Sequence, residues 1–292
     1  MDAPKLFDCF PFFNELDLLE LRLRELDGVV DHFVLVEARE TFAGKPKPLH
    51  FEANAARFAP WADKITHIVV DHFPPRRSKW SNEHVQRAAL QAGIAQAAPQ
   101  DLVMLSDLDE IVKPEVLAGL KAQPPSKGEV LCFELRFFQF YLNLENPQQK
   151  WLRIGPRLAR RDTVRNIRML RQIRAREGGG PRDWLRLARA SWVMRRIISR
   201  RIISDAGLHF SWLGGAAAVA EKFSAIPDQV GLSGEIDETR AKAFIRGNVD
   251  FSPHLQVMQI DESFPRAVRD NTQQLAHLIY SDPKGTGWEG RR

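Results

Sequence analysis

The first 140 residues alternate between two hydrophobic periods, a pattern typical of a sheet built from strand–helix–strand units. Leucines spaced three and four residues apart predict an amphipathic helix that ends near Leu26, with Asn14 as its N-cap. Residues 29–36 form a nearly continuous apolar run, as expected for a strand buried on both faces of a parallel sheet. The chain is therefore predicted to be an α/β protein with a central, mostly parallel sheet flanked by helices.

Later segments continue the alternation. They predict strands at 65–70, 101–105 and 130–140, a helix capped by Ser81 or Asn82, and a helix that starts at Pro114.

Positive charge is concentrated in one segment. Residues 151–201 contain 16 Arg, no Lys and three acidic residues, a net charge of +13, whereas the whole chain carries only +5. We interpret about 151–204 as an Arg-rich helical insertion in a single domain of residues 1–280, followed by a flexible tail, 281–292. A phosphate clamp, an anionic membrane surface and a nucleic-acid patch are all consistent with such charge, and solvated helices explain most of these side chains equally well. Nucleic acid is the weakest specific interpretation, because no recognised binding motif accompanies the arginines.

Composition excludes several classes of protein. The 292 residues are 44% hydrophobic and 27% charged, which indicates an ordinary globular protein rather than a disordered chain. Two cysteines, Cys9 and Cys132, allow at most one disulfide. No apolar run reaches the roughly 18 residues of a membrane span, and the first residues lack a secretory signal pattern, so we expect a cytoplasmic protein.

Candidate chemistry follows the strand at 101–105. Asp107 and Asp109 alternate in an extended segment, so their carboxylates share one face at the carboxyl edge of the predicted sheet. Carboxylate oxygens suit Mg²⁺ or Mn²⁺, and Glu110 adds a third acid nearby. His209 lies in a glycine-rich stretch and is a candidate metal ligand, although a histidine beside Leu208 and Phe210 is more often a core residue.

Several motifs taken together resemble glycosyltransferase family 17. The resemblance covers roughly residues 5–280 and rests on Phe7-Asp8-Cys9-Phe10-Pro11-Phe12-Phe13-Asn14-Glu15, Phe33-Val34-Leu35-Val36-Glu37-Ala38, Thr41-Phe42-Ala43-Gly44, Ser106-Asp107-Leu108-Asp109-Glu110-Ile111 and Gly207-Leu208-His209-Phe210-Ser211-Trp212. It implies a GT-A type nucleotide-sugar-binding fold and inverting transfer of N-acetylglucosamine, or a related sugar, from a UDP-sugar donor to a glycan acceptor.

The resemblance also implies roles for individual residues. Asp107 and Asp109 would hold Mn²⁺ or Mg²⁺ against the donor diphosphate, with His209 as the third protein ligand. The uridine and diphosphate pocket would be formed by Glu37, Thr41 and Arg87 together with Asp107. A carboxylate would act as the catalytic base, and Glu134 and Asp205 are both candidates.

Because the chain starts without the membrane anchor of the animal members, we expect a bacterial-type enzyme that builds polysaccharide on a lipid-linked acceptor. Its location would be cytoplasmic and peripheral at the inner membrane face, held there by the Arg-rich segment. Two other functions are retained as alternatives. One is a metal-dependent sugar nucleotidyltransferase, and the other is a non-catalytic basic adaptor that binds a membrane or nucleic acid.

Overall fold

The computed structural model describes residues 3–75, 78–175, 180–225, 237–245 and 255–281. It divides into two compact units, of which the first comprises Met1–Leu135 and Trp151–Gly207 and the second comprises Arg136–Lys150 and Leu208–Arg292. Strands β6 (Glu129–Gln139) and β9 (Ser199–Ser211) each begin in the first unit and end in the second. The single-domain boundary at residue 280 stays a prediction, and the predicted tail lies almost entirely outside the described residues.

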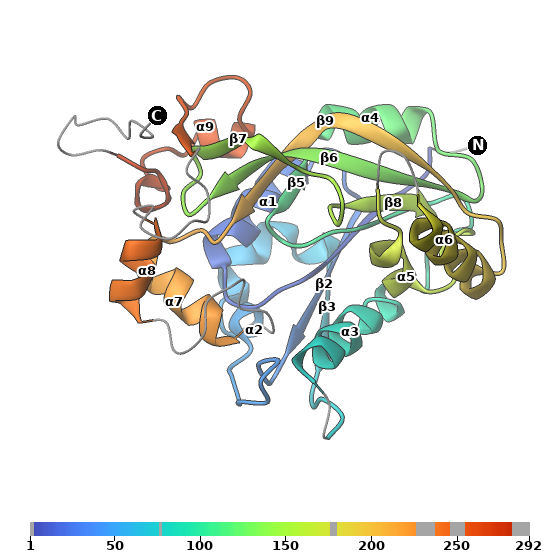
Figure 1. The fold of residues 1–292 in the computed structure, drawn as a ribbon, viewed down its shortest axis with the longest axis horizontal. Helices are drawn as coiled ribbons and strands as arrows, with labels where there is room; N and C mark the ends of the chain where they lie inside the picture. Colours follow the sequence, from blue (N-terminus) through green and yellow to red (C-terminus); the bar gives the residue numbers. More distant parts are fainter. Residues whose placement is uncertain (1–2, 76–77, 176–179, 226–236, 246–254, 282–292) are drawn as a thin grey trace. The chain divides into compact units, whose positions relative to one another are not determined.

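The first unit is built on a sheet with the strand order β8-β4-β1-β2-β3, in which β1 pairs in parallel with β2 and β4, and β2 pairs in parallel with β3. Strand β8 is antiparallel to β4 and to the start of β6 (Figure 1). The bounds of these strands are β1 Leu6–Pro11, β2 His32–Ala38, β3 Ile65–Val70, β4 Leu102–Leu105 and β8 Arg157–Arg160, and the short strand β5, Glu110–Val112, pairs with β9. The α/β class predicted from the sequence is confirmed, and the parallel strands are those of the first 105 residues.

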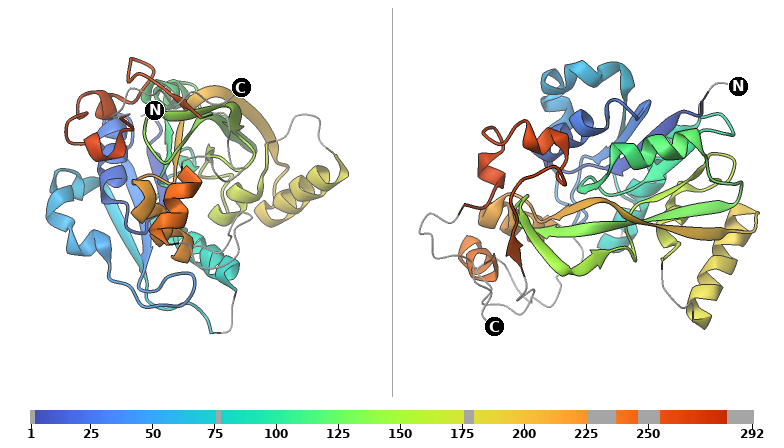
Figure 2. Two further views of the ribbon diagram at one scale, coloured as in Figure 1. Left: turned by 60° about the vertical axis from the view of Figure 1, so that its left-hand side comes forward. Right: turned by 90° about the horizontal axis from the view of Figure 1, so that it is seen from above.

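Helices connect these strands and cover the sheet (Figures 1 and 2). The helices of the first unit are α1 Leu16–Leu26, α2 His50–Ala53, η1 Ala55–Lys64, α3 Lys79–Ala89, η2 Ala92–Ile94, α4 Pro114–Ala122, α5 Ile167–Gln172 and α6 Pro181–Met194. Alternate residues of β1 and β4, such as Cys9 and Val103, pack with Ile94 and Met169 in one core cluster, so α3, η2, α5 and α6 cover one face of the sheet. Asp8 points to the opposite face, where α1 lies.

Two predicted helix caps are wrong, the first by one residue and the second by three or four. Helix α1 begins at Leu16 rather than after Asn14, because the Asn14 carbonyl accepts a hydrogen bond from the Leu16 amide in a turn before the helix. Helix α3 begins at Lys79, because the Ser78 hydroxyl accepts from the Ser81 amide at 3.2 Å and serves as the N-cap. The helix that starts at Pro114 is confirmed.

The second unit contains the ends of β6 and β9 and, except for its last residue, β7 (Leu144–Trp151). It also contains β10 Gln256–Val257, α7 Gly215–Ala225, α8 Glu238–Ile245, α9 Arg266–Arg269 and η3 Ala276–Leu278. Strand β10 is antiparallel to β7, and α7 packs on α8. A small core of Phe140, Leu144, Val219, Ala241 and Leu255 holds these elements together.

Both cysteines are buried and free, Cys9 in β1 and Cys132 in β6. Among the described residues, no helix has the length and apolar character needed to cross a bilayer.

Candidate active site

The acidic segment Ser106–Glu110 leaves the carboxyl end of β4, a strand whose four residues are all buried. It forms a tight turn, because the Asp107 amide donates to the Glu110 carboxylate at 2.8 Å and the Glu110 amide donates to the Asp107 carbonyl at 3.1 Å. Strand β4 is parallel to β1, so this acidic turn lies at the sheet edge where open α/β folds place their ligands. Asp107 and Asp109 thus follow the end of β4 as predicted, but they lie in a turn rather than in an extended segment. That their two carboxylates share one face stays a prediction.

A buried arginine, Arg22, binds the backbone of the acidic turn. The Arg22 side chain has no solvent exposure, and its Nη1 donates to the carbonyls of Asp107, Leu108 and Glu110 at 3.2, 3.2 and 2.7 Å. Its remaining donors bind the Asp8 carboxylate at 2.7 and 2.6 Å and the Ser106 hydroxyl at 2.6 Å. Arg22 therefore fixes the backbone of the turn, and Asp8 balances its charge within the core.

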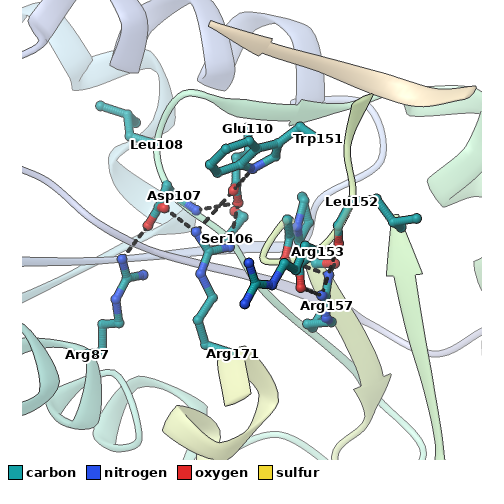
Figure 3. A network of polar contacts seen from close by, with 12 residues as sticks. Arg87, Ser106, Asp107, Leu108, Glu110, Trp151, Leu152, Arg153, Arg157 and Arg171 are labelled. Carbon is teal, nitrogen blue, oxygen red and sulfur yellow. Dashed lines mark hydrogen bonds and ion pairs between the residues drawn. The ribbon is translucent and has the colours of Figure 1, made fainter. Parts of the chain in front are cut away.

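Two further arginines reach the carboxylates of the turn (Figure 3). Arg87 of α3 pairs with one oxygen of Asp107 at 2.6 Å and also with Glu83 at 2.9 Å. Arg171 of α5 pairs with the other oxygen of Asp107 and binds both oxygens of Glu110, at 2.9 and 3.0 Å. Asp107 and Arg87, both predicted donor-binding residues, are in direct contact.

Neighbouring opposite charges shift the pKa values of Asp107 and Arg171. Burial raises the pKa of the Asp107 carboxyl, but the charges of Arg171 and Arg87 outweigh it and hold that pKa below its usual value. Burial acts to lower the pKa of Arg171, but the charges of Asp107 and Glu110 outweigh it and hold that pKa above its usual value. The buried Glu110 carboxylate, besides its bonds from the Asp107 amide and Arg171, accepts a hydrogen bond from the Trp151 indole at 2.6 Å. The pKa shifts therefore favour the charged forms of Asp107, Arg87 and Arg171.

The carboxylates partly fit a divalent ion. Within the part of the chain that the structure describes, no three His, Cys, Asp or Glu side chains are grouped as a metal site. Asp107 is partly open to solvent and Asp109 is nearly buried two residues further on. One or two carboxylates, completed by water and phosphate oxygens, are sufficient for Mg²⁺. Such an ion would have to exchange with the arginines that now occupy both oxygens of Asp107.

Glu37 and Thr41, predicted for the uridine pocket, organise a loop in this structure. The buried Glu37 carboxylate, at the end of β2, accepts from Lys47 Nζ at 2.9 Å and from the amides of His50 and Phe51 at 2.6 and 3.2 Å. Burial raises the pKa of Glu37, but His67 and Lys47 lower it more, to a net value below normal. Thr41 closes the preceding turn through a 2.8 Å hydrogen bond between its amide and the Lys45 carbonyl. A direct role of either residue in donor binding stays a prediction.

The two candidate bases differ in their surroundings. Asp205 of β9 is largely exposed and pairs with Lys113 at 2.7 Å, whereas Glu134 of β6 is partly buried. His209 belongs to the second unit, where its buried ring stacks on Phe137 with centroids 5.2 Å apart. The choice of base and the role of His209 as a metal ligand therefore stay predictions.

Sequence reasoning missed Arg22, Arg171 and Trp151. A signal for Arg22 does exist, because it lies on the same helical face as Leu19, Leu23 and Leu26 and has an acid, Asp8, as its counterpart in an otherwise apolar strand. Arg171 gives no such signal, since it is one of 16 arginines in its segment and lies 64 residues after Asp107.

Comparison with known proteins agrees with the sequence motifs. The model of glycosyltransferase family 17 matches residues 1–178. The β-1,4-mannosyl-glycoprotein 4-β-N-acetylglucosaminyltransferases of Homo sapiens and Rattus norvegicus are each 34% identical to this chain over 106 residues, which are 34% of this chain and 20% of each relative. Among solved structures, 4-diphosphocytidyl-2C-methyl-D-erythritol synthase from Anaerococcus prevotii has 12% identity and a TM-score of 0.40, covering 84% of this chain and 100% of its own. A galactosyltransferase, LgtC, has 12% identity and a TM-score of 0.33, covering 96% of this chain and 98% of its own.

Proposed function

Because the chain belongs to glycosyltransferase family 17, we propose that it transfers N-acetylglucosamine, or a related sugar, from a UDP-sugar to a hydroxyl group of a glycan acceptor. The observation that carries the proposal is the convergence of Arg87 and Arg171 on the acidic turn Ser106–Glu110 at the end of β4. Acids and guanidinium groups at one sheet edge provide partners both for a cation and for the phosphates of a nucleotide.

Asp107 and Asp109 are the residues that would hold a divalent ion, Mn²⁺ or Mg²⁺. When bound, the ion would supply positive charge against the diphosphate of the leaving UDP. Release of Arg87 and Arg171 from Asp107 would free two guanidinium groups for the same diphosphate. Arg171 would keep its contact with Glu110 and so stay positioned at the turn. The exchange leaves every buried charge paired before and after donor binding, which limits its energetic cost.

The transfer step is an inverting single displacement. The acceptor oxygen forms a bond to the anomeric carbon while the bond from that carbon to the β-phosphate oxygen breaks and UDP leaves. The proton of the acceptor hydroxyl passes to a carboxylate, for which Glu134 and Asp205 are the candidates. Arg87 and Arg171 would stabilise the charge that develops on the diphosphate.

The acceptor is proposed to be a glycan on a lipid carrier, as in the synthesis of bacterial polysaccharides. The curated relatives act on a mannosyl glycoprotein, as their names state, and the match covers only a fifth of their length. We therefore do not assign the acceptor or the linkage from these relatives.

A donor screen tests the proposal. The full chain is incubated with Mn²⁺ and each of several UDP-sugars, with and without lipid-linked glycan, and UDP release is measured. We expect release with one donor, and loss of at least about 100-fold in Asp109→Ala. The matched control is Asp71→Asn, because Asp71 is an exposed acid paired with Arg39. Full activity of Asp109→Ala contradicts the proposed site, and release of pyrophosphate from UTP and a sugar 1-phosphate identifies a nucleotidyltransferase instead.

A further inference from the structure

Helix α6 is apolar on two opposite sides. Its inner side, represented by Ala190 and Met194, is buried in the core of the first unit. Figures 1 and 2 show α6 beside α5, with its other side turned away from the sheet. On that outer side Trp184 is 72% exposed and Trp192 is 81% exposed. Eight residues separate the two tryptophans, so they lie on one side of the helix within about 80° of each other, at 100° per residue. Leu185 falls on the same side.

Exposed large side chains of this kind are concentrated here. Among the described residues, seven large apolar side chains are more than a third exposed, and four of them lie between residues 184 and 197: Trp184, Leu185, Trp192 and Ile197. Tryptophan and leucine in water leave a large apolar area unburied, and large exposed apolar areas mark binding surfaces.

The charge around this patch has a single sign. Arg182, Arg189 and Arg195 are exposed around the tryptophans. The acid of this helix, Asp183, is 2% exposed, and its carboxylate is engaged by Arg200. The outer side of α6 therefore presents tryptophan, leucine and arginine, with no exposed acid between residues 180 and 197.

We propose that the outer side of α6 binds an anionic phospholipid surface. Tryptophan and leucine would enter the boundary between headgroups and acyl chains, and the arginines would contact lipid phosphates, each arginine adding a favourable electrostatic contribution. Long arginine side chains can keep their charge at the headgroups while their stems cover apolar area. Charge alone would also suit nucleic acid, but a helix side that exposes both tryptophan and leucine favours lipid. The inference does not depend on the proposed sugar transfer.

Vesicle binding tests the inference. The full chain is sedimented with vesicles of phosphatidylcholine alone or with 30% phosphatidylglycerol, over a range of salt concentrations. We expect binding to the anionic vesicles only, weakening as salt rises. Brominated acyl chains should quench tryptophan fluorescence.

Two variants localise the binding to α6. Trp184→Ser/Trp192→Ser should lower the partition coefficient by at least about tenfold, equivalent to about 1.4 kcal/mol. Arg182→Glu/Arg189→Glu should remove the preference for anionic vesicles. The matched control is Trp80→Ser, because Trp80 is 50% exposed but lies on α3. The substituted side chains are exposed, and circular dichroism verifies that each variant is folded.

Several results would overturn the inference. Equal binding of the tryptophan double variant would show that α6 does not contact the lipid. Absence of binding to any vesicle, at any salt concentration, would exclude a membrane surface as the partner. A dimer in analytical ultracentrifugation that dissociates in the tryptophan variant, together with no vesicle binding, would assign the patch to a second copy of this chain.

Discussion

Replacing Arg22 should separate the stability of the core from the organisation of the acidic turn. Arg22 and Asp8 are both fully buried, and their charged groups are joined by two hydrogen bonds of 2.7 and 2.6 Å. Arg22→Met retains a long side chain but leaves the Asp8 carboxylate buried without its cation. Loss of one partner from a buried ion pair costs about 3 to 5 kcal/mol. We expect a decrease of that size in the free energy of unfolding, measured by urea titration with tryptophan fluorescence.

The double variant Asp8→Leu/Arg22→Met sharpens the test. It removes the uncompensated charge together with the arginine, so we expect it to regain part of the lost stability. It does not restore the donor that binds the carbonyls of Asp107, Leu108 and Glu110. Each hydrogen bond lost from these carbonyls costs about 0.5 to 1.5 kcal/mol, so recovery should be incomplete. UDP release should stay low in the double variant although the protein is folded.

Three results would refute this reasoning. A loss of less than about 1 kcal/mol in Arg22→Met would show that the pair is not a core ion pair. A double variant no more stable than the single one would show that the uncompensated charge is not the cause. Wild-type UDP release by the double variant would show that Arg22 acts through stability alone and does not position the turn.

Two further predictions concern individual charges. Arg171→Met should raise the affinity for Mn²⁺ in the absence of the sugar donor on the order of tenfold, because it frees an oxygen of Asp107. Calorimetric titration measures this affinity, and Arg165→Met, which replaces an exposed arginine, should leave it unchanged. Equal affinities in Arg171→Met and wild type would show that the ion and the arginine do not compete. Because the native pKa of Glu37 lies below the ordinary value of 4.5, its ion pair stabilises the protein fully above that pH and is lost as the pH falls through the native pKa. Urea titrations should therefore show that Glu37→Gln is less stable than wild type at pH 7 by about 3 kcal/mol, and that this difference shrinks below pH 4.5. A difference that does not change with pH would show that ionisation of Glu37 does not contribute to stability.

The order of elements was readable from the sequence because it depends on local patterns. Strands β1, β2 and β4 are buried on both faces and appear as apolar runs, and Pro114 marks a helix start. The helix caps were less predictable, since Ser78 and Ser81 are chemically equal candidates and only the backbone conformation shows that Ser78 accepts the hydrogen bond.

The candidate site was readable only in part. The acidic turn follows from its place after a buried strand, and Arg87 came from the family resemblance. The contact between Arg171 and Asp107 depends on how α5 packs near the end of β4, which no local pattern encodes. Glu37 illustrates a different limit, because its loop partners Lys47 and His50 become apparent only when the chain is folded.

The 64-residue separation between Asp107 and Arg171 also sets an order of events during synthesis. At 5 to 20 residues per second, a ribosome adds Arg171 about 3 to 13 s after Asp107. During that interval Arg22 and Arg87 have been translated, but the residue whose guanidinium group binds both Asp107 and Glu110 has not. The acidic turn therefore cannot acquire its full set of intramolecular partners until Arg171 has been translated.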